Sequence, residues 1–360
     1  MDCLVLGRRG VDKVKIESLK VIQMLPEFHE GGVERHVLWL SSALAKQGHE
    51  VMVVSKGGKL EKFLDEGVKV WHLPVHVKNP FTALWCALLV ARRAKSEGWQ
   101  IIHAHSRVPF WIAWWASSLS GVSWVATLHA TFRHSRALLP LKKAPACICV
   151  SWSVKEHLAS YLPEKTFVIY NGLLPMVKKR QKDLPKGPYK FLFMGRLTPK
   201  KGLQVAIKAL SKVKGDWALD IVGDGPMRGE LEDLVVKLGL SDKVQFWGFR
   251  EDTDEWLARC SCLLFPSFEE GMSMTLIRAI DMGVPILASD IPSVRELCLN
   301  PEALIEPGDE NSWKKAIEEA LRERKSLQLF DRDKIGTIDD MAKDVADVYQ
   351  SCIEEARKGK

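Results

Sequence analysis

The 360-residue sequence lacks a hydrophobic run long enough to cross a membrane. The stretch from Phe81 to Ala91 is about half a membrane span, and the longer run from 108 to 131 is interrupted by serines and a glycine. The first twenty residues have neither the uninterrupted apolar core nor the cleavage site of a secretory signal. These absences predict a protein that stays in the cytoplasm.

Low-complexity tracts of Pro, Gly, Ser or Gln are also absent, which argues against long disordered segments. With 46% hydrophobic and 27% charged residues, the composition is that of a globular protein. A chain of 360 residues exceeds what one hydrophobic core usually organises, so we expect two domains.

Cysteine spacing typical of zinc sites is missing as well. The eight cysteines include Cys147-x-Cys149 and Cys260-x-Cys262, whereas zinc ligands normally stand at C-x2-C or wider, with further His or Cys nearby. Both pairs lie in apolar runs typical of strands, and we interpret them as reduced, buried thiols. We therefore expect no metal site.

Acidic residues are missing between Glu97 and Glu156, a stretch that holds six of the 13 tryptophans. Residues 1 to 186 carry 27 basic and 14 acidic side chains, net +13, and the remainder carries 25 basic and 31 acidic, net −6. A basic, Trp-rich surface suits nucleic acid, an anionic membrane surface, or an anionic acceptor presented at that membrane. Composition leaves the three open, although no nucleic-acid-binding module is recognisable.

Short apolar runs alternate with amphipathic stretches along the chain, beginning with Val21 to Leu25, a glycine loop, and Val33 to Lys46. This alternation predicts parallel sheets covered on both faces. A stretch rich in Pro and Lys interrupts the rhythm and indicates a linker. We predict a Rossmann-like domain over 1–172, a linker over 173–188, a second Rossmann-like domain over 189–337, and a final helix over 338–360 that crosses back to the first domain.

Ligands of open parallel sheets bind beyond the carboxyl ends of the strands, so residues just after predicted strands are the candidates for function. Gly31 and Gly32 would let a ligand approach the positive end of a helix, although ordinary loops also contain glycine pairs. They lack the G-x-G-x-x-G spacing of dinucleotide sites, and Ser55 ends the second strand in place of an acidic residue. A dehydrogenase is therefore disfavoured.

Three more candidates follow strands of the second domain. Arg196 and Lys201 lie in Gly195-Arg196-Leu-Thr-Pro-Lys-Lys201-Gly202, where two separated cations beside a helix N-terminus suit a diphosphate. Gly223-Asp-Gly225-Pro226 could admit a base or phosphate closely, or be a plain turn with proline at the first helical position. The segment from 266 to 274 presents Glu270, a bidentate acceptor for sugar hydroxyls, with backbone N–H groups.

Together these motifs resemble glycosyltransferase family 4, whose GT-B fold has two Rossmann-like domains with parallel sheets facing a central cleft. The resemblance spans roughly residues 21 to 308. Besides the motifs above, it includes Gly48-His-Glu-Val51, His103-x-His105-Ser106, Asn171-Gly172 and Pro266-Ser267.

The resemblance implies a retaining, metal-independent transfer from a nucleotide-diphosphate sugar, with no cofactor. Arg196 and Lys201 would stabilise the departing diphosphate, Glu270 would hold sugar hydroxyls, and His105 would line the reacting centre, unless it is a packed strand-end residue. The implied donor-binding set is Gly31, Gly32, Gly223, Gly225, Gly271, Met272, Ser273 and Arg278. On the acceptor side we expect His129, Arg107 and Arg133.

One position departs from the family pattern. The family usually has a second glutamate eight positions after the first, and here that position is Arg278, which could reach a phosphate or pair with Asp281 one turn away. The change motivates a rival hypothesis, a non-catalytic homologue that binds nucleotide or glycan as a partner or scaffold. Retention of Arg196, Lys201 and Glu270 favours the enzyme.

The expected partners are a nucleotide sugar, an anionic glycan or glycolipid acceptor, and the membrane surface, but no nucleic acid. In this fold the first domain generally holds the acceptor, and its charge of +13 suits an anionic one. We expect a hexosyltransferase of lipopolysaccharide or surface polysaccharide synthesis, cytoplasmic and peripheral at the inner face of the cell membrane.

Overall fold

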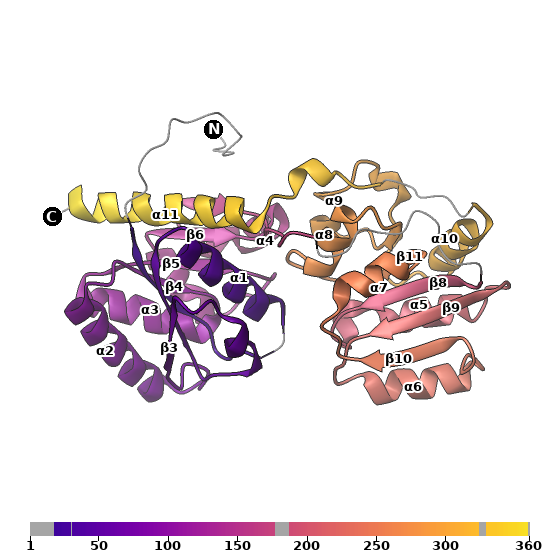
Figure 1. Cartoon of the computed structure of the whole chain (residues 1–360), viewed down its shortest axis with the longest axis horizontal. Helices are drawn as coiled ribbons and strands as arrows, with labels where there is room; N and C mark the ends of the chain where they lie inside the picture. The colour runs from indigo at the N-terminus through magenta and orange to yellow at the C-terminus, as the bar shows by residue number, and fades with distance from the viewer. Residues whose placement is uncertain (1–17, 30, 177–186, 324–328, 359–360) are drawn as a thin grey trace. The chain divides into compact units, whose positions relative to one another are not determined.

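The computed structural model describes residues 18–29, 31–176, 187–323 and 329–358 (Figure 1). The chain divides into two compact units, the first made of residues 1–174 and 336–360 and the second of residues 175–335. The first unit continues to Leu174 instead of ending at 172, and the final helix is part of it. The predicted linker over 173–188 is shared between the units, and its residues 177–186 lie outside the described ones.

The first unit contains a seven-stranded, all-parallel sheet in the order β3-β2-β1-β4-β5-β6-β7. Its central strands are mostly apolar and almost entirely buried, as expected for a sheet covered on both faces. The strands are β1 (Lys20–Met24), β2 (Glu50–Ser55), β3 (Val68–His72), β4 (Ile101–Ala104), β5 (Ser123–Leu128), β6 (Ala146–Cys149) and β7 (Thr166–Val168).

Helices cover both faces of this sheet (Figure 1). One face shares a hydrophobic core with α1 (Gly32–Lys46) and the long final helix α11 (Ile338–Lys358). The helices α2 (Pro80–Glu97) and α3 (Arg107–Ser120) pack against each other, and α3 packs on β4 and β5. The remaining helical segments are α4 (Trp152–Leu158), η1 (Lys59–Phe63), η2 (Arg136–Lys143) and η3 (Ala159–Tyr161).

The start and end of α2 follow directly from its sequence. Asn79 caps the helix, because its side-chain oxygen accepts a hydrogen bond from the backbone N–H of Phe81 at 2.8 Å. Pro80 occupies the first helical position, where no N–H partner is needed. Gly98 ends the helix in the left-handed conformation at φ 72°.

The second unit contains a five-stranded, all-parallel sheet in the order β10-β9-β8-β11-β12. The strands are β8 (Tyr189–Met194), β9 (Trp217–Val222), β10 (Val244–Gly248), β11 (Cys262–Phe265) and β12 (Ile286–Ala288). The helices are α5 (Leu203–Leu210), α6 (Arg228–Lys237), α7 (Thr253–Arg259), α8 (Met274–Asp281), α9 (Pro292–Arg295) and α10 (Glu310–Glu323), with η4 (Pro199–Lys201), η5 (Pro301–Ala303) and η6 (Arg332–Lys334).

Strand order reverses once in each sheet, between β1 and β4 in the first and between β8 and β11 in the second. At such a switch point, connections leave in opposite directions and open a crevice beyond the carboxyl ends of the strands. Gly31 and His105 follow β1 and β4, and Arg196 and Glu270 follow β8 and β11. The strand order therefore positions the predicted site residues.

The chain leaves and re-enters the first unit at neighbouring points. Leu173 and Thr337 form a parallel bridge, in which Leu173 N–H donates to the Gly336 carbonyl at 3.1 Å. A methyl group added at Gly172 would stand 2.4 Å from the carbonyl oxygen of Thr337, so a side chain does not fit there without a shift of the backbone. The final helix is thus joined closely to the segment that precedes the second unit.

The described cysteines are buried free thiols. Cys147 and Cys149 lie in β6 and Cys262 in β11, as their apolar surroundings predict. Burial raises the pKa of Cys149 to about 12, which keeps this thiol protonated.

Candidate active site

Three loops meet at the carboxyl edge of the second sheet. They are the segments 195–202 after β8, 223–227 after β9, and 266–273 after β11. Leu197 N–H donates to the Asp224 carbonyl at 2.9 Å, and Phe268 N–H donates to the Lys200 carbonyl at 2.8 Å. The three motifs predicted separately from the sequence therefore form one continuous backbone surface.

Glycine is required where these loops touch. Gly202 has φ 65°, and a methyl group there would stand 1.9 Å from the carbonyl oxygen of Pro266. Gly223 has φ 138°, and its methyl group would stand 1.9 Å from the carbonyl oxygen of Gly195. The positive φ and the backbone approach each exclude a side chain. The glycines that flank Arg196 and Lys201 thus set the loop geometry.

Lys201 and Glu270 form an ion pair at the centre of this surface, through Nζ and Oε1. The hydroxyl of Ser267 donates to the same Oε1 at 2.9 Å. The two charged side chains are 24% and 12% exposed, so solvent screens their attraction only in part. The structure brings together the cation and the carboxylate that the sequence assigned to diphosphate and sugar.

Arg196 lies in the same loop, and its side chain is exposed. Among the described residues no hydrogen bond or ion pair engages its guanidinium, whereas neighbouring Lys200 pairs with Glu269 at 2.6 Å. A guanidinium presents a planar set of donors that matches phosphate oxygens in pairs. Arg196 is therefore available to an anionic ligand.

The start of α8 borders the pair. Ser273 caps this helix, with its hydroxyl accepting from Leu276 N–H at 3.4 Å, and Gly271, Met272 and Ser273 are buried. Helix N-termini favour negative charge because their first N–H groups lack partners within the helix. Contact of these three residues with a donor stays a prediction.

Arg278 is held by carboxylates instead of facing open space. Its guanidinium donates to both carboxylate oxygens of Asp254, at 2.9 and 3.1 Å, and to Asp281 at 3.3 Å. Asp281 also pairs with Arg332 at 2.8 Å. Arg278 and Asp254 are 13% and 12% exposed, so this is a largely buried network. The sequence left two partners open for Arg278, a phosphate or Asp281, and the structure shows the pair with Asp281. Contact of Arg278 with the donor stays a prediction.

In the first unit, Gly31 precedes α1 and Gly32 is its first residue. A methyl group at Gly31 would stand 2.1 Å from Oε2 of Glu34, so the carboxylate of Glu34 lies against the start of the helix. Gly32 has nothing within 4 Å of such a methyl group. A negative side chain therefore occupies the position at which the sequence predicts phosphate approach.

Four histidines form a cluster. His103, His105 and His129 lie at the carboxyl ends of β4 and β5, and His36 comes from α1. His105 contacts Gln23 through Nε2 at 2.6 Å and His129 Nε2 through Nδ1 at 3.1 Å. His103 lies between the hydroxyls of Tyr349 and Thr127, each at 2.6 Å. His36 Nδ1 contacts Asn171 Oδ1 at 2.9 Å. The cluster draws residues from both ends of the chain.

The contacts of His105 define which of its two ring nitrogens donates a hydrogen bond and which accepts one. The amide oxygen of Gln23 accepts, so His105 carries its proton on Nε2, and its Nδ1 must accept from His129. The Gln23 amide donates to the Tyr349 hydroxyl at 3.0 Å, and that hydroxyl also shares a hydrogen bond with Nδ1 of His103. The hydrogen bond to Gln23 therefore fixes the tautomer of His105.

Burial also keeps these imidazoles neutral. Desolvation lowers the pKa of His36 to about 4, against a small opposing effect of its Asn171 hydrogen bond. Desolvation, followed by repulsion from the neighbouring histidines, holds the pKa values of His103, His105 and His129 well below their usual range. At neutral pH the cluster is an uncharged polar network.

Neutral imidazoles are potential metal ligands, and nitrogens of His36, His105 and His129 lie within 4.8 Å of one another. His36 Nε2 is buried and has no hydrogen-bond partner among the described residues. However, Nδ1 of His105 already accepts a hydrogen bond from Nε2 of His129, so neither of these two nitrogens is free to bind a metal ion. Within the part of the chain that the structure describes, these three residues form the group that could hold a metal ion, and our prediction remains a metal-independent reaction.

Two other residues, Arg107 and Arg133, are assigned to the acceptor side. Arg107, at the start of α3, is exposed and stacks over the ring of Phe132 at 5.5 Å. Arg133 is the next residue and is exposed. Arg107 therefore contacts the ring of the residue that precedes Arg133, and contact of Arg107 and Arg133 with an acceptor stays a prediction.

Sequence reasoning did not assign roles to several members of this site. No sequence motif marks Glu34, Gln23 or Tyr349. Tyr349 contacts residues more than two hundred positions away in the chain. His36 lies five positions after Gly31, and Asn171 belongs to the Asn171-Gly172 fragment. A buried His on the apolar face of a helix was the signal that could have found His36.

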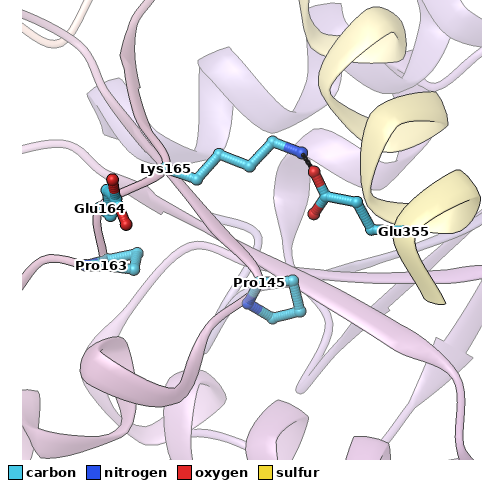
Figure 2. A pocket seen from close by; sticks show the side chains of 5 residues that line it. All are labelled: Pro145, Pro163, Glu164, Lys165 and Glu355. Carbon is cyan, nitrogen blue, oxygen red and sulfur yellow. Dashed lines mark hydrogen bonds and ion pairs between the residues drawn. The ribbon is translucent and has the colours of Figure 1, made fainter. Parts of the chain in front are cut away.

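An open pocket of about 480 Å³ lies elsewhere in the first unit (Figure 2). Pro145, Pro163, Glu164, Lys165 and Glu355 line it, and none of the predicted site residues does. Figure 2 shows Lys165 reaching Glu355, a 2.5 Å ion pair that joins the residue before β7 to α11. We assign it a structural role.

Comparison with known proteins identifies the class. Residues 30–173 match the family model for Glycosyltransferase Family 4, and residues 177–334 match the model for glycosyl transferases group 1. An uncharacterised glycosyltransferase of Methanocaldococcus jannaschii is 27% identical over 74% of this chain and 78% of its own length. One component of the human phosphatidylinositol N-acetylglucosaminyltransferase is 28% identical over 76% of this chain and 62% of its own.

A Salmonella typhimurium O-antigen chain mannosyltransferase is 30% identical over 50% of this chain and 52% of its own. The crystal structure of Anabaena HepE in complex with UDP-glucose superposes with a TM-score of 0.73, at 20% identity over 95% of this chain and 99% of that one. The chain therefore belongs to the glycosyltransferases that combine a family 4 domain with a group 1 domain. The expected GT-B fold and hexosyltransferase class are confirmed. Among the described helices, none is long and apolar enough to span a membrane.

Proposed function

We propose that this glycosyltransferase moves a hexose from a nucleotide-diphosphate sugar to a lipid-linked or phosphorylated glycan acceptor, with retention of configuration and without a metal ion. The observation that carries the proposal is the pairing of Lys201 with Glu270 beside Arg196, at the switch point of the second sheet. The donor complex of the HepE structure supports a donor of this class.

Transfer breaks the bond between the anomeric carbon and the diphosphate oxygen and forms a bond from that carbon to an acceptor hydroxyl oxygen. The hydroxyl proton passes to the leaving diphosphate, on which negative charge grows. Arg196 and Lys201 are positioned to stabilise that charge, which is the task a metal ion performs in other enzymes. Glu270 then accepts hydrogen bonds from hydroxyls of the transferred sugar, and the Lys201 charge is shared between carboxylate and phosphate. These pre-placed groups need little rearrangement as the donor reacts.

For the first unit we propose an acceptor role. His105 lines the reacting centre, with its tautomer fixed by Gln23, while His129, Arg107 and Arg133 face the acceptor. The net charge of +13 in residues 1 to 186 favours an acceptor that carries phosphate. The names of the phosphatidylinositol and O-antigen relatives support a lipid-linked acceptor in surface polysaccharide synthesis. We further propose that the enzyme is peripheral at the inner face of the cell membrane.

The test is a thermal-shift and hydrolysis screen against UDP, GDP, ADP and TDP and their sugars, with EDTA present. We expect one nucleotide to stabilise the protein and its sugar to be hydrolysed slowly. Arg196→Ala and Glu270→Ala should each lower turnover by roughly a hundredfold or more. The matched control is Lys212→Ala, which removes a surface cation paired with Glu310 at 2.7 Å.

Turnover that EDTA abolishes would contradict the metal-independent reaction. Nucleotide binding without hydrolysis of any nucleotide sugar would favour the rival scaffold role. Loss of turnover in Lys212→Ala equal to that in Glu270→Ala would show that the assay reports stability instead of the site.

A further inference from the structure

The helix α2 exposes a stripe of large apolar side chains. Phe81, Leu84, Trp85 and Leu88 are 84%, 44%, 51% and 51% exposed. At about 3.6 residues per turn, these positions fall on one side of the helix. The opposite side, with Ala83, Cys86, Ala87, Val90, Ala91 and Ala94, is buried. The helix is therefore already packed in the unit without the exposed stripe.

The same stripe becomes basic in the last turns of α2. Arg92 and Lys95 continue the spacing from Leu88 and are exposed. Glu97, the acidic residue of this helix, is occupied by Arg93 at 2.8 Å and by the indole N–H of Trp99 at 2.9 Å. The face thus combines an apolar half with a positive half.

The charged residues in this part of the sequence are almost all basic. Between Glu66 and Glu156 the sequence has eleven Lys and Arg residues and a single acidic residue, Glu97. The helix α3 packs beside α2 and begins at the exposed Arg107 (Figure 1). Two copies of this surface would place like charges opposite each other, which disfavours a symmetric dimer through this face.

We propose that this face of α2 docks on an anionic lipid bilayer, with Phe81, Leu84, Trp85 and Leu88 in the headgroup region and Arg92 and Lys95 against lipid phosphates. Aromatic and aliphatic side chains on one face of a helix with basic neighbours are the features of interfacial helices. Long basic side chains can extend from an apolar surface to the headgroups. The inference rests on the proposed action at a membrane and names the surface responsible.

The experiment is flotation of the full chain with vesicles of phosphatidylcholine alone, or of phosphatidylcholine and phosphatidylglycerol in equal parts, at low salt. We expect flotation with the anionic vesicles and little with the neutral ones. The double variant Trp85→Glu, Leu88→Glu should lower the bound fraction about tenfold. The matched control is Val236→Glu, Leu299→Glu, which changes two similarly exposed side chains of the second unit and should bind like the parent.

A second variant, Arg92→Glu with Lys95→Glu, tests the charged half separately and should remove the preference for anionic vesicles. Equal binding of the Trp85→Glu, Leu88→Glu variant and the parent, or equal binding to both vesicle types, would overturn the proposal. A parent dimer that this variant dissociates would identify the face as a protein interface and would also overturn it.

Nucleotide stabilisation is measured on the same samples. If nucleotide stabilises every variant while vesicles bind none, the docking surface is wrong and the proposed transferase stands. If vesicles bind as expected but no nucleotide stabilises the protein, the donor assignment fails and the docking surface stands.

Discussion

Arg278 stands where the family has a second carboxylate, and Asp254 and Asp281 hold it on two sides. The three charges lie in a largely buried network, so each depends on the others for compensation.

Restoring the family residue should consequently destabilise this protein. Arg278→Glu would replace the cation between Asp254 and Asp281 with a third carboxylate, and we expect a loss of about 3–5 kcal/mol in the free energy of unfolding, measured by urea denaturation at neutral pH. The control is Arg295→Glu. The pair with Asp290 leaves this arginine 57% exposed, so its replacement should cost much less than that of Arg278. Equal losses in the two variants would refute this interpretation.

His36 gives the stability a pH dependence. Its pKa is lowered from 6.5 to about 4 by burial, so between these values the unfolded chain binds a proton that the folded chain does not. The contribution of His36 to the free energy of unfolding is therefore fully present above pH 6.5. It falls by about 3 kcal/mol as the pH decreases toward 4. Urea titrations over that range measure the slope.

The slope should be shallower in His36→Gln than in the parent, because one buried imidazole is gone. The exposed His134 is the matched position, and His134→Gln should keep the parent slope. A parent-like slope in His36→Gln would show that other groups account for the acid sensitivity.

At the scale of elements, the loops beyond β8 and β11 are joined by backbone contact at Gly202. Gly239 has nearly the same backbone conformation, φ 67° against 65°, yet nothing lies within 4 Å of an added methyl group. The two glycines therefore separate the cost of a left-handed backbone from the cost of a steric clash.

Gly239→Ala should cost about 1–2 kcal/mol, the strain of the left-handed conformation alone. Gly202→Ala should cost about 2–5 kcal/mol, because its methyl group also displaces the Pro266 carbonyl. Urea denaturation measures both. Nucleotide binding should weaken only in Gly202→Ala, where the Lys201 loop moves, and equal effects in the two variants would contradict the clash.

Much of this arrangement follows from sequence. Apolar strands alternating with helices predict two parallel sheets, and strand ends predict where Arg196, Lys201, Glu270 and His105 lie. The side-chain contacts around the site are harder to predict from the sequence. Gln23 contacts Tyr349 only once the chain has folded, and Asp254 reaches Arg278 from another helix. Local patterns encode strands and turns, whereas contacts across a sheet depend on strand order.

At the scale of the whole molecule, α11 completes the core of the first unit. Its buried residues include Ile338, Met341, Val345, Val348 and Ile353. Each large buried side chain contributes roughly 1.5–3 kcal/mol, so together they approach the 5–15 kcal/mol net stability of a typical domain. The first unit depends on this helix.

A chain that ends at Ile335 should therefore lose the first unit while keeping the second. We expect limited proteolysis to digest residues 19–174 rapidly and to spare fragments of 187–323, resolved by mass spectrometry. A chain that ends at Ala356 keeps every buried residue of α11 and should resist like the parent. Equal protection of residues 19–174 in both truncated chains would contradict the dependence.

The bridge between Leu173 and Thr337 also bears on the order of events during synthesis on the ribosome. Domains generally fold as they emerge, from the N-terminal end onward. Here the first sheet emerges early, but the helix that carries Tyr349 to Gln23 and His103 emerges only after the second unit. The second unit can therefore finish folding before α11 covers the first sheet, so the unit that starts to emerge first is completed after the second.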